Sequence, residues 1–500
     1  MGAELEPAKA PPGGAAGQTH PRGLFTLFFT EMWERFSYYG MRALLVLFMV
    51  DQVRHGGMGL TDEVATSIYG LYTAAVYLAA LPGGWLADRL FGAQRSVWYG
   101  GIVIATGHFV LAIPRGETFY LGLVLVVLGT GLLKPNISAI VGELYPEGGA
   151  RRDAGFTIFY MGINLGAAIG PLICSTLGEK LNWHYGFGAA GVGMVLGLVQ
   201  FRLTRRHLGP AGLKPGQEAP LHRMERAGVA CALAAFFLVV GLGLAGGLHF
   251  NPVALARGTT TFIVAVALLY FAYLFLFFKL DQTEKQRVGV IAILFLGAAL
   301  FWSGFEQAGS AFNLFADRYT VRQLASFDFL IPAGWFQSLG PVFIISLAPL
   351  MAALWVALAQ RNLNPSLPTK FGLGLLLLGL GFVVMAVASS YVAAGHKVLP
   401  VWLVITYFVH TLGELCLSPV GLSSVTKLAP RRLVGQMMGT WFLASSLGNL
   451  IAGLAAGQIK AEALEQMPWQ YLQMIFLPVI AGIGLIVLAK PIRKWMAGVD

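Results

Sequence analysis

The chain has 500 residues, of which 56% are apolar and 12% are charged, and its mean hydropathy is +0.69. This composition excludes a soluble protein of this length and predicts a multi-pass membrane protein. The net charge of +10 is compatible with nucleic-acid binding, but the distribution of basic residues among the loops gives it another explanation. Cys174, Cys231 and Cys416 stand far apart inside apolar segments, so neither a disulfide framework nor a metal site is predicted.

Residues 1–23 form a polar tail rich in Pro, Gly and Ala. The tail has no short apolar core ending in a small-residue cleavage site, so we expect a disordered cytoplasmic segment rather than a signal peptide. The rest of the chain contains fourteen apolar runs that are long enough to cross about 30 Å of hydrocarbon. We predict transmembrane helices at 24–52, 64–88, 95–114, 117–142, 154–177, 184–204, 224–248, 258–279, 290–316, 333–359, 370–393, 398–427, 434–459 and 469–490.

Basic residues distinguish the two sides of this predicted bundle. If the N-terminus is cytoplasmic, most of the 34 Lys and Arg residues fall in segments on the same side as the N-terminus. The positive-inside rule therefore predicts that both termini lie in the cytoplasm. The positive net charge is then a signature of topology, and no nucleic-acid partner is expected.

A basic linker that contains Pro and Gly, from Arg205 to Arg226, follows the first six predicted helices. An inserted helix pair and six further helices come after it. This order predicts an all-α membrane protein with twelve core helices in two six-helix bundles, which meet at a central cavity, plus two inserted helices. The predicted units are the tail 1–23, the N-terminal bundle 24–204, the linker and hairpin 205–289, the C-terminal bundle 290–490 and the tail 491–500.

The first predicted helix carries an unusual group of ionisable residues at membrane depth. Polar side chains recur there at i, i+3, i+4, i+7 and i+8, which places them on one helical face. These residues are Glu31, Glu34, Arg35, Tyr38 and Tyr39. An ionisable group inside the bilayer costs roughly 3 kcal/mol, so this face must contact protein or water and is typical of an ion or substrate site. The alternative is that the charges only join two helices.

The loop between the second and third predicted helices contains Asp88, Arg89 and Arg95 among glycines. Glycine permits a tight turn, and the charges can pair across neighbouring helix ends, which suits a gating role. The stretch 83–95 resembles the loop motif of the major facilitator superfamily. A salt-bridged turn without a gating role is the alternative.

The fourth and fifth predicted helices each add polar groups in mid-span. Lys134 stands beside Pro135 and is too deep to reach the interface, so it requires an anion: Glu31, Glu34 or a ligand carboxylate. Tyr160 and Asn164 are one turn apart on a face of small residues. Close helix packing alone is the alternative explanation for that face.

The C-terminal half carries polar stripes at helical spacing. They are Trp302, Glu306 and Asn313 on the ninth predicted helix, His410, Glu414 and Ser418 on the twelfth, and Trp441 and Ser445 on the thirteenth. We interpret His410 as an ordinary buried histidine. Fixed cations on one side of a cavity and acids on the other suit a zwitterion, with aromatic residues lining apolar subsites. Because a carboxylate in a low-dielectric site takes up a proton more readily, proton coupling is a further hypothesis.

Five of these segments together resemble the proton-dependent oligopeptide transporter (POT) family of the major facilitator superfamily, bacterial type. They are 31–40, the Lys134 segment, 159–167, 301–307 and 413–419, and the resemblance extends over about residues 24–492. It implies a symporter of the bacterial inner membrane that imports di- and tripeptides with protons by alternating access. It implies no enzymatic activity, no cofactor other than the coupling ion H+ and no obligate protein partner.

The resemblance also implies roles for individual residues. Proton coupling would involve Glu31, Glu34, Arg35 and Glu306. The peptide carboxylate would bind Arg35 and Lys134, and the amino terminus would bind Glu414 with help from Asn164. The remaining substrate-binding residues would be Tyr38, Tyr39, Tyr77, Trp302, Ser418, Trp441 and Ser445. The family usually has Asn at the position of Gly340, and its absence removes a hydrogen bond to the peptide and puts in doubt how well typical family substrates are held.

Two other readings are compatible with the sequence. A transporter of the same family could carry another anion or zwitterion, such as nitrate or a modified peptide. A membrane receptor or enzyme belongs to a different class, but the sequence shows no metal-ligand cluster, Ser/His/Asp set, nucleotide-binding loop or sizeable soluble domain for one.

Overall fold

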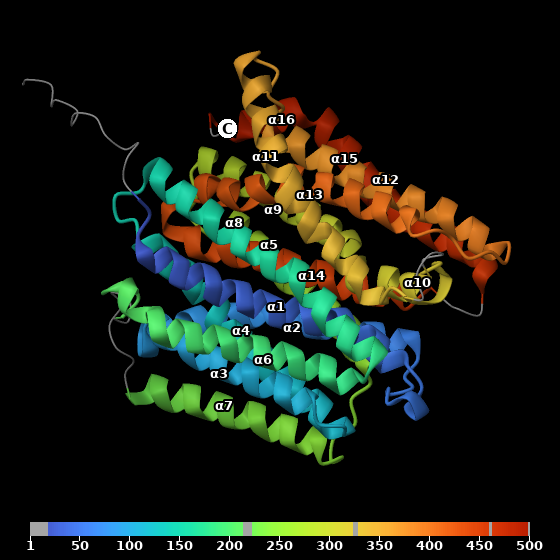
Figure 1. The fold of residues 1–500 in the computed structure, drawn as a ribbon. Helices are drawn as coiled ribbons and strands as arrows, with labels where there is room; N and C mark the ends of the chain where they lie inside the picture. The colour runs from blue at the N-terminus through green and yellow to red at the C-terminus, as the bar shows by residue number, and fades with distance from the viewer. Residues whose placement is uncertain (1–18, 214–222, 324–328, 460–462, 499–500) are drawn as a thin grey trace, which may run out of the picture.

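The computed structural model describes residues 19–213, 223–323, 329–459 and 463–498, except for the side chains of 418–420 and 422–423. The predicted tail at 1–23 and the linker at 205–226 therefore lie partly outside the described residues. Within the described ranges the chain is helical, and its only β pairing consists of two isolated bridges, one of them between Thr320 and Val398. Figure 1 shows that most of the helices lie side by side in a bundle, which α11 crosses at a steeper angle.

The helices of the N-terminal half are α1 (Arg22–Val50), α2 (Asp62–Leu86), α3 (Ala93–Leu111), α4 (Gly116–Glu143), α5 (Gly149–Lys180) and α6 (Trp183–Thr204), with short turns η2 (Val53–His55), η3 (Ala87–Phe91) and η4 (Arg205–Leu208). The inserted hairpin consists of α7 (Arg223–Leu244) and α8 (Pro252–Leu276). The C-terminal half contains α9 (Gln282–Phe305), η5 (Glu306–Gly309), α10 (Ala311–Tyr319), η6 (Ala333–Ser338), α11 (Leu339–Gln360), α12 (Leu367–Ala393), α13 (Val401–Leu428), η7 (Arg431–Leu433), α14 (Val434–Ala456), η8 (Leu464–Gln466), α15 (Met467–Val487) and α16 (Ala489–Trp495).

Helix length and composition agree with a multi-pass membrane protein. In the described part of the chain, 11 helical segments are long and apolar enough to cross a membrane, with α9 and α10 counted as one segment. Together with α1, α3 and α13 they account for the fourteen predicted helices. α1 carries the ionisable residues predicted to face the protein interior, and Glu31, Glu34 and Arg35 are all buried in the structure.

Two sets of helices pack among themselves and then against each other. α1 lies along α5 and α6, and α3 lies along α4, while α12 packs on α13 and α15. The sets meet where α2 contacts α14 and where α5 contacts α11 and η6. Small residues permit the first of these approaches: a Cβ on Gly70 would lie 3.2 Å from the Cα of Gly453. The unit boundaries predicted from the sequence stay predictions.

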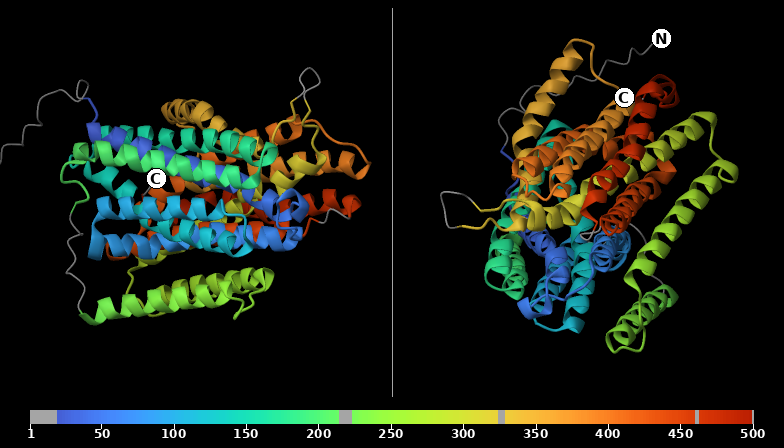
Figure 2. Two further views of the ribbon diagram at one scale, coloured as in Figure 1. Left: turned by 60° about the horizontal axis from the view of Figure 1, so that its bottom comes forward. Right: turned by 90° about the vertical axis from the view of Figure 1, so that its right-hand side faces the viewer.

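The hairpin of α7 and α8 lies at the outside of the bundle (Figure 2). No residue of α7 is buried in the structure, although this helix is among the most apolar in the chain. An apolar helix that buries nothing against protein is one whose side chains face lipid. The hairpin therefore adds two spans without contributing side chains to a protein core on the α7 side.

The structure adds three details to the predicted helices and the C-terminal tail. The helix predicted at 290–316 is interrupted by η5, so Trp302, Glu306 and Asn313 lie on three successive elements rather than on one continuous face. The helix predicted at 333–359 begins as the turn η6, and α16 occupies part of the predicted tail 491–500. We call the end of the bundle where α1 begins and α2 ends the proximal end, and the opposite end the distal end.

Candidate functional site

The polar face of α1 forms a buried charge triad. The Nε atom of Arg35 lies 2.7 Å from Oε1 of Glu31 and 2.9 Å from Oε2 of Glu34. All three side chains are almost inaccessible to solvent, and among the described residues Oε2 of Glu31 has no hydrogen-bond partner. One guanidinium therefore balances two carboxylates, which is an arrangement suited to the uptake of a proton.

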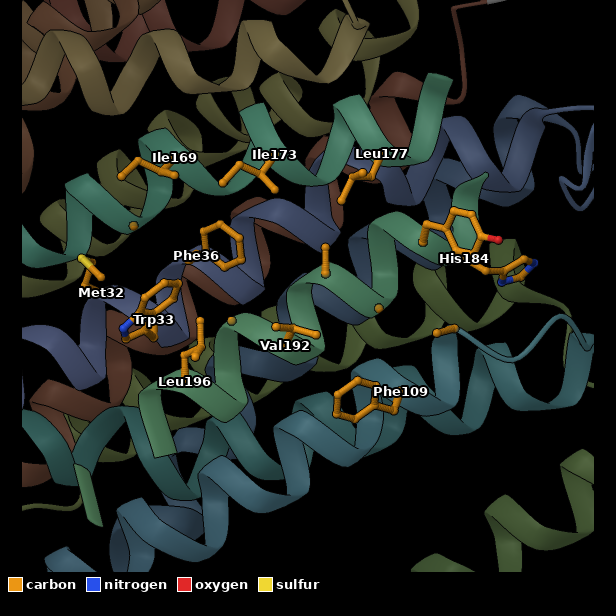
Figure 3. A pocket seen from close by; sticks show the side chains of 16 residues that line it. Met32, Trp33, Phe36, Phe109, Ile169, Ile173, Leu177, His184, Val192 and Leu196 are labelled. Carbon is orange, nitrogen blue, oxygen red and sulfur yellow. The ribbon is translucent and has the colours of Figure 1, made fainter. Parts of the chain in front are cut away.

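The opposite face of α1 is apolar, as the helical period predicted. Met32, Trp33 and Phe36 point into a groove of about 680 Å³ that α5 and α6 also line (Figure 3). The groove is lined almost entirely by apolar side chains. The division of α1 into a charged face and an apolar face is therefore confirmed.

Lys134 reaches toward the triad from α4 but contacts an aromatic ring. Its Nζ lies 4.2 Å from the centre of the ring of Tyr77, which α2 supplies. Within the described chain the ammonium forms no salt bridge with Glu31 or Glu34, the anions that we considered for it. It remains within electrostatic reach of Glu34. A cation held by a ring face is free to accept a ligand carboxylate.

An ion pair between the two halves involves a residue that the sequence interpretation did not select. Nη2 of Arg42 on α1 lies 2.6 Å from Oε2 of Glu306 on η5, and both side chains are buried. Nε of Arg42 donates a hydrogen bond to the hydroxyl of Tyr69 on α2. A signal was present in the sequence, because Arg42 follows Arg35 by seven residues and so continues the same helical face.

Aromatic residues lie between these charges. The ring of Tyr38 stacks on that of Tyr72 at 6.2 Å and meets the edge of Tyr39 at 5.2 Å. Tyr39 is within electrostatic reach of charged groups from both halves of the protein. These groups are Arg35, Arg42, Glu306 and Glu414. Residues that are far apart in the sequence therefore converge around the tyrosines of α1.

The C-terminal half contributes polar atoms without partners. Glu414 on α13 is 7% exposed, and its Oε2 has no hydrogen-bond partner among the described residues. The same holds for Nε1 of Trp302 on α9. A buried polar group left unpaired costs about 1–3 kcal/mol, so Glu414 is a candidate to bind a proton or a ligand cation, and Trp302 is a candidate to donate a hydrogen bond to a ligand.

Other predicted site residues bond locally. Nδ2 of Asn164 donates to the carbonyl oxygen of Tyr160 at 2.9 Å, and Oγ of Ser445 donates to that of Trp441 at 3.3 Å. Nε2 of His410 is 3.1 Å from the carbonyl oxygen of Leu378, so it is a satisfied buried histidine. These groups are buried, but their described bonds do not show a ligand role. The side chain of the predicted Ser418 lies outside the described part of α13.

The predicted gating loop is a π-helical turn followed by a glycine. Asp88 and Arg89 lie in η3, and Gly92 has φ of 75°, a left-handed conformation that favours glycine. Arg95 is exposed at the start of α3, and Nε2 of Gln94 next to it donates to the carbonyl oxygen of Ala211 at 2.6 Å. The turn exists as predicted, and its gating role stays a prediction.

At the distal end, polar contacts join the two halves. Arg318 of α10 donates two hydrogen bonds to Asp62 of α2, at 2.6 and 2.8 Å. The carboxylate of Glu179 at the end of α5 accepts from the backbone N–H groups of Ala333 and Gly334 in η6, at 2.7 and 2.9 Å. We call these two sets of contacts the distal clamp. The sequence interpretation did not identify it.

Two helical halves that enclose buried and incompletely paired charges define a secondary transporter of the major facilitator type. The sequence matches the POT family over residues 94–470, and the chain belongs to this family. It is therefore a transporter, as the sequence motifs predicted, and not an enzyme.

Relatives agree with this assignment over nearly the whole chain. The sequence is 46% identical over 497 residues to the peptide transporter YePEPT of Yersinia enterocolitica, with 97% of each chain covered. It is 38% identical over 489 residues to a di-/tripeptide transporter of Lactococcus lactis subsp. cremoris, covering 96% of this chain and 97% of the relative. A solved structure of a variant of a peptide transporter POT in complex with alafosfalin is similar to this structure with a TM-score of 0.88, 43% identity and 97% of each chain covered.

Proposed function

We propose that this chain imports di- and tripeptides together with protons across the bacterial inner membrane by alternating access, with both termini in the cytoplasm. One observation carries the proposal: charges of both halves are buried together beside Tyr39, where Arg42 lies 5.5 Å from the centre of the Tyr39 ring and 2.6 Å from Glu306 of the C-terminal half. The names of the relatives support the substrate class, since the Lactococcus lactis relative is a di-/tripeptide transporter.

A short peptide matches this distribution of charge. Its carboxylate and its ammonium are separated by several ångströms, and it is neutral overall, so both ends need a fixed partner. Arg35 and Lys134 bind the carboxylate in this proposal, while Glu414 binds the ammonium through the oxygen that has no partner in the described structure. The side-chain subsites are formed by Tyr38, Tyr39, Tyr77, Trp302, Trp441 and Ser445, and Asn164 and Ser418 belong to the same binding region.

The proton acts on the triad of α1. While Glu31 and Glu34 are both ionised, they hold Arg35 by short contacts and compete with a peptide carboxylate for it. Protonation of one acid weakens that hold and frees the guanidinium for substrate, so proton and peptide favour the same state. Glu306, which is paired with Arg42, is the second protonation site. H+ is the only coupling ion in this scheme, and no cofactor or partner protein is required.

The contacts between the halves indicate how access alternates. The structure has the distal clamp formed, and the buried pair of Arg42 and Glu306 also joins the halves. Opening toward the distal side requires these contacts to separate. Protonation of Glu306 removes the charge that holds Arg42, and release of substrate and proton at the proximal side restores it.

The test is uptake of a labelled dipeptide by proteoliposomes under an imposed pH gradient. Glu31→Gln and Glu34→Gln are expected to lose gradient-driven uptake while retaining exchange of labelled for unlabelled peptide, because exchange needs no net proton movement. Glu117→Gln, the same change at an exposed site in the first turn of α4, is the matched control and keeps both activities. Full gradient-driven uptake by both triad variants contradicts the coupling scheme.

Gly340 favours a second substrate class. Gly340 is buried, and a Cβ at this position would meet no atom within 4 Å, so there is an open space where the family resemblance leads us to expect an Asn side chain. The substrate in that case is another anion or zwitterion, such as nitrate or a modified peptide. Competition separates the two: unlabelled di-alanine blocks uptake by a dipeptide transporter and leaves that of the alternative unchanged.

A further inference from the structure

A basic hollow lies at the proximal end of the bundle, away from the proposed peptide site. α3 and α6 pack side by side (Figure 1), and their proximal ends border a hollow of about 780 Å³. Its lining includes Arg95, Trp98, Phe201, Arg202, Arg205 and Arg206. None of the residues that line the hollow is acidic, and four of them are arginines, so its lining is basic.

The arginines of the hollow are available to a ligand. Arg95, Arg202, Arg205 and Arg206 are all exposed, and within the described ranges none of the four forms a salt bridge. Elsewhere in the protein, arginines such as Arg318 are paired with acids at short distance. Four unpaired guanidinium groups around one hollow repel one another, and an anion relieves that repulsion.

The wall of the hollow is apolar and aromatic. The indole of Trp98 on α3 stacks on the ring of Phe201 on α6, with 6.3 Å between centres and 22° between planes. Leu203 is 70% exposed at the edge of the hollow. A small soluble anion gains little from such a wall, whereas an amphiphilic anion gains from both the charges and the apolar surface.

An exposed apolar stripe extends from the hollow along α6. Its residues are spaced by three or four positions, which places them on one face of the helix. They are Val192, Val195, Leu196, Val199 and Leu203, all exposed. Val192 and Leu196 also line the apolar groove beside α1 (Figure 3). The stripe and the groove give a continuous apolar path from the membrane interior to the arginines.

We propose that the hollow binds the phosphate headgroup of an anionic phospholipid, whose acyl chains lie along the stripe of α6. Guanidinium groups match phosphate oxygens in paired hydrogen bonds, and basic pockets between transmembrane helices at the cytoplasmic surface are suited to acidic lipid headgroups. A zwitterionic lipid carries a cation of its own that opposes the four arginines. Free phosphate shares the headgroup chemistry but has no acyl chain for the apolar path.

The test is native mass spectrometry of the purified full chain, titrated with phosphatidylglycerol or phosphatidylcholine. The test variant is Arg202→Gln/Arg206→Gln. The control is Lys490→Gln/Lys494→Gln, which removes two exposed charges from α16 at the same end of the other half. Each basic side chain contributes about fivefold to binding of an anionic lipid, so the test variant should bind the first phosphatidylglycerol about 25-fold more weakly.

The expected result is this loss in the test variant, unchanged binding in the control, weaker binding of phosphatidylcholine by all three proteins and no displacement by millimolar inorganic phosphate. Equal binding by the test variant and the wild-type protein overturns the proposal, and so does equal affinity for the two lipids. Displacement by phosphate assigns the hollow to a soluble anion instead and also overturns it. Because the substituted arginines are exposed, a melting temperature equal to that of the control shows that folding is not the cause.

Discussion

Asp62→Asn should loosen the distal clamp by an amount that its geometry allows us to calculate. The change replaces the acceptor of two charge-assisted hydrogen bonds, of 2.6 and 2.8 Å, whose side chains are 27% exposed for Arg318 and 19% for Asp62. A fully buried pair of this kind contributes more, and a fully exposed one contributes almost nothing. For this intermediate burial we expect about 2 kcal/mol, which shifts the equilibrium between closed and open distal ends by about 30-fold.

The neighbouring residue provides a matched control. Glu63 also loses one negative charge on conversion to Gln, and it also lies in the first turn of α2, so both variants lose the same favourable interaction with the helix dipole. Its ion pair with Arg257 of α8 is longer, at 3.3 Å, and its side chains are 53% and 68% exposed. Such a pair contributes little. The difference between the two variants therefore isolates the clamp.

Pulsed electron paramagnetic resonance between spin labels on the two halves measures this shift. Val53 in η2 and Leu399 before α13 are suitable label sites, because both are at the distal end and highly exposed. Asp62→Asn should add a population at longer distance, and Glu63→Gln should leave the wild-type distribution. An unchanged distribution for Asp62→Asn, or an equal change in the control, would refute the role of this ion pair.

Three further changes test other contacts. Gly340→Asn should not lower the stability of the protein, because its side chain enters open space. It should increase dipeptide affinity, measured by competition for uptake, because it supplies the hydrogen bond to the peptide that glycine lacks. Gly83→Ala should lower the melting temperature, because the new Cβ clashes with the carbonyl oxygen of Gly131, whereas Gly84→Ala has 3.7 Å to its nearest neighbour and should be neutral or stabilising. Glu179→Gln should release η6 and increase the exchange of its amide hydrogens, since the amide side chain offers one acceptor to two N–H donors; unchanged exchange there contradicts this role.

Most of the fold could be predicted because the bilayer constrains both length and composition. A helix needs about 20 apolar residues to span it, and that signal is local in the sequence. The break at η5 was not predicted, although Glu306, Gln307, Gly309 and Ser310 interrupt the apolar run there. At the break, Glu306 pairs with Arg42, and Gly309 has no room for a Cβ against Tyr69.

The α1 part of the site was also predictable, for a different reason. The cost of burying charge requires that Glu31, Glu34 and Arg35 share a protein-facing side, and the helical period shows that they do. The choice of partner was not predictable to the same extent. The sequence leaves Glu31, Glu34 or a ligand carboxylate open as the anion of Lys134, and the structure places its ammonium over the ring of Tyr77. Coulomb attraction favours a carboxylate as the neighbour of the Lys134 ammonium, whereas the side-chain geometry brings the ammonium to the ring of Tyr77.

Contacts between the halves lay beyond the reach of sequence reasoning. Asp62 and Arg318 are 256 positions apart, and neither belongs to a motif. Arg42 continues the polar face of α1, yet its acid is supplied by the other half. A single sequence shows which residues need a partner, whereas the fold determines which partner is within reach.

The interruption at η5 makes α10 a short separate helix with an ion pair near each of its ends. This helix has nine residues, so it is about 13 Å long. Just before its first residue, Glu306 forms an ion pair with buried Arg42. Close to its last residue, Arg318 forms an ion pair with Asp62. A continuous helix through this region would have to bend for one of the two ion pairs to separate while the other stayed formed. With the break, α10 can rotate as a rigid body about η5. Separation of Glu306 from Arg42 can then displace Arg318 from Asp62 at the distal end.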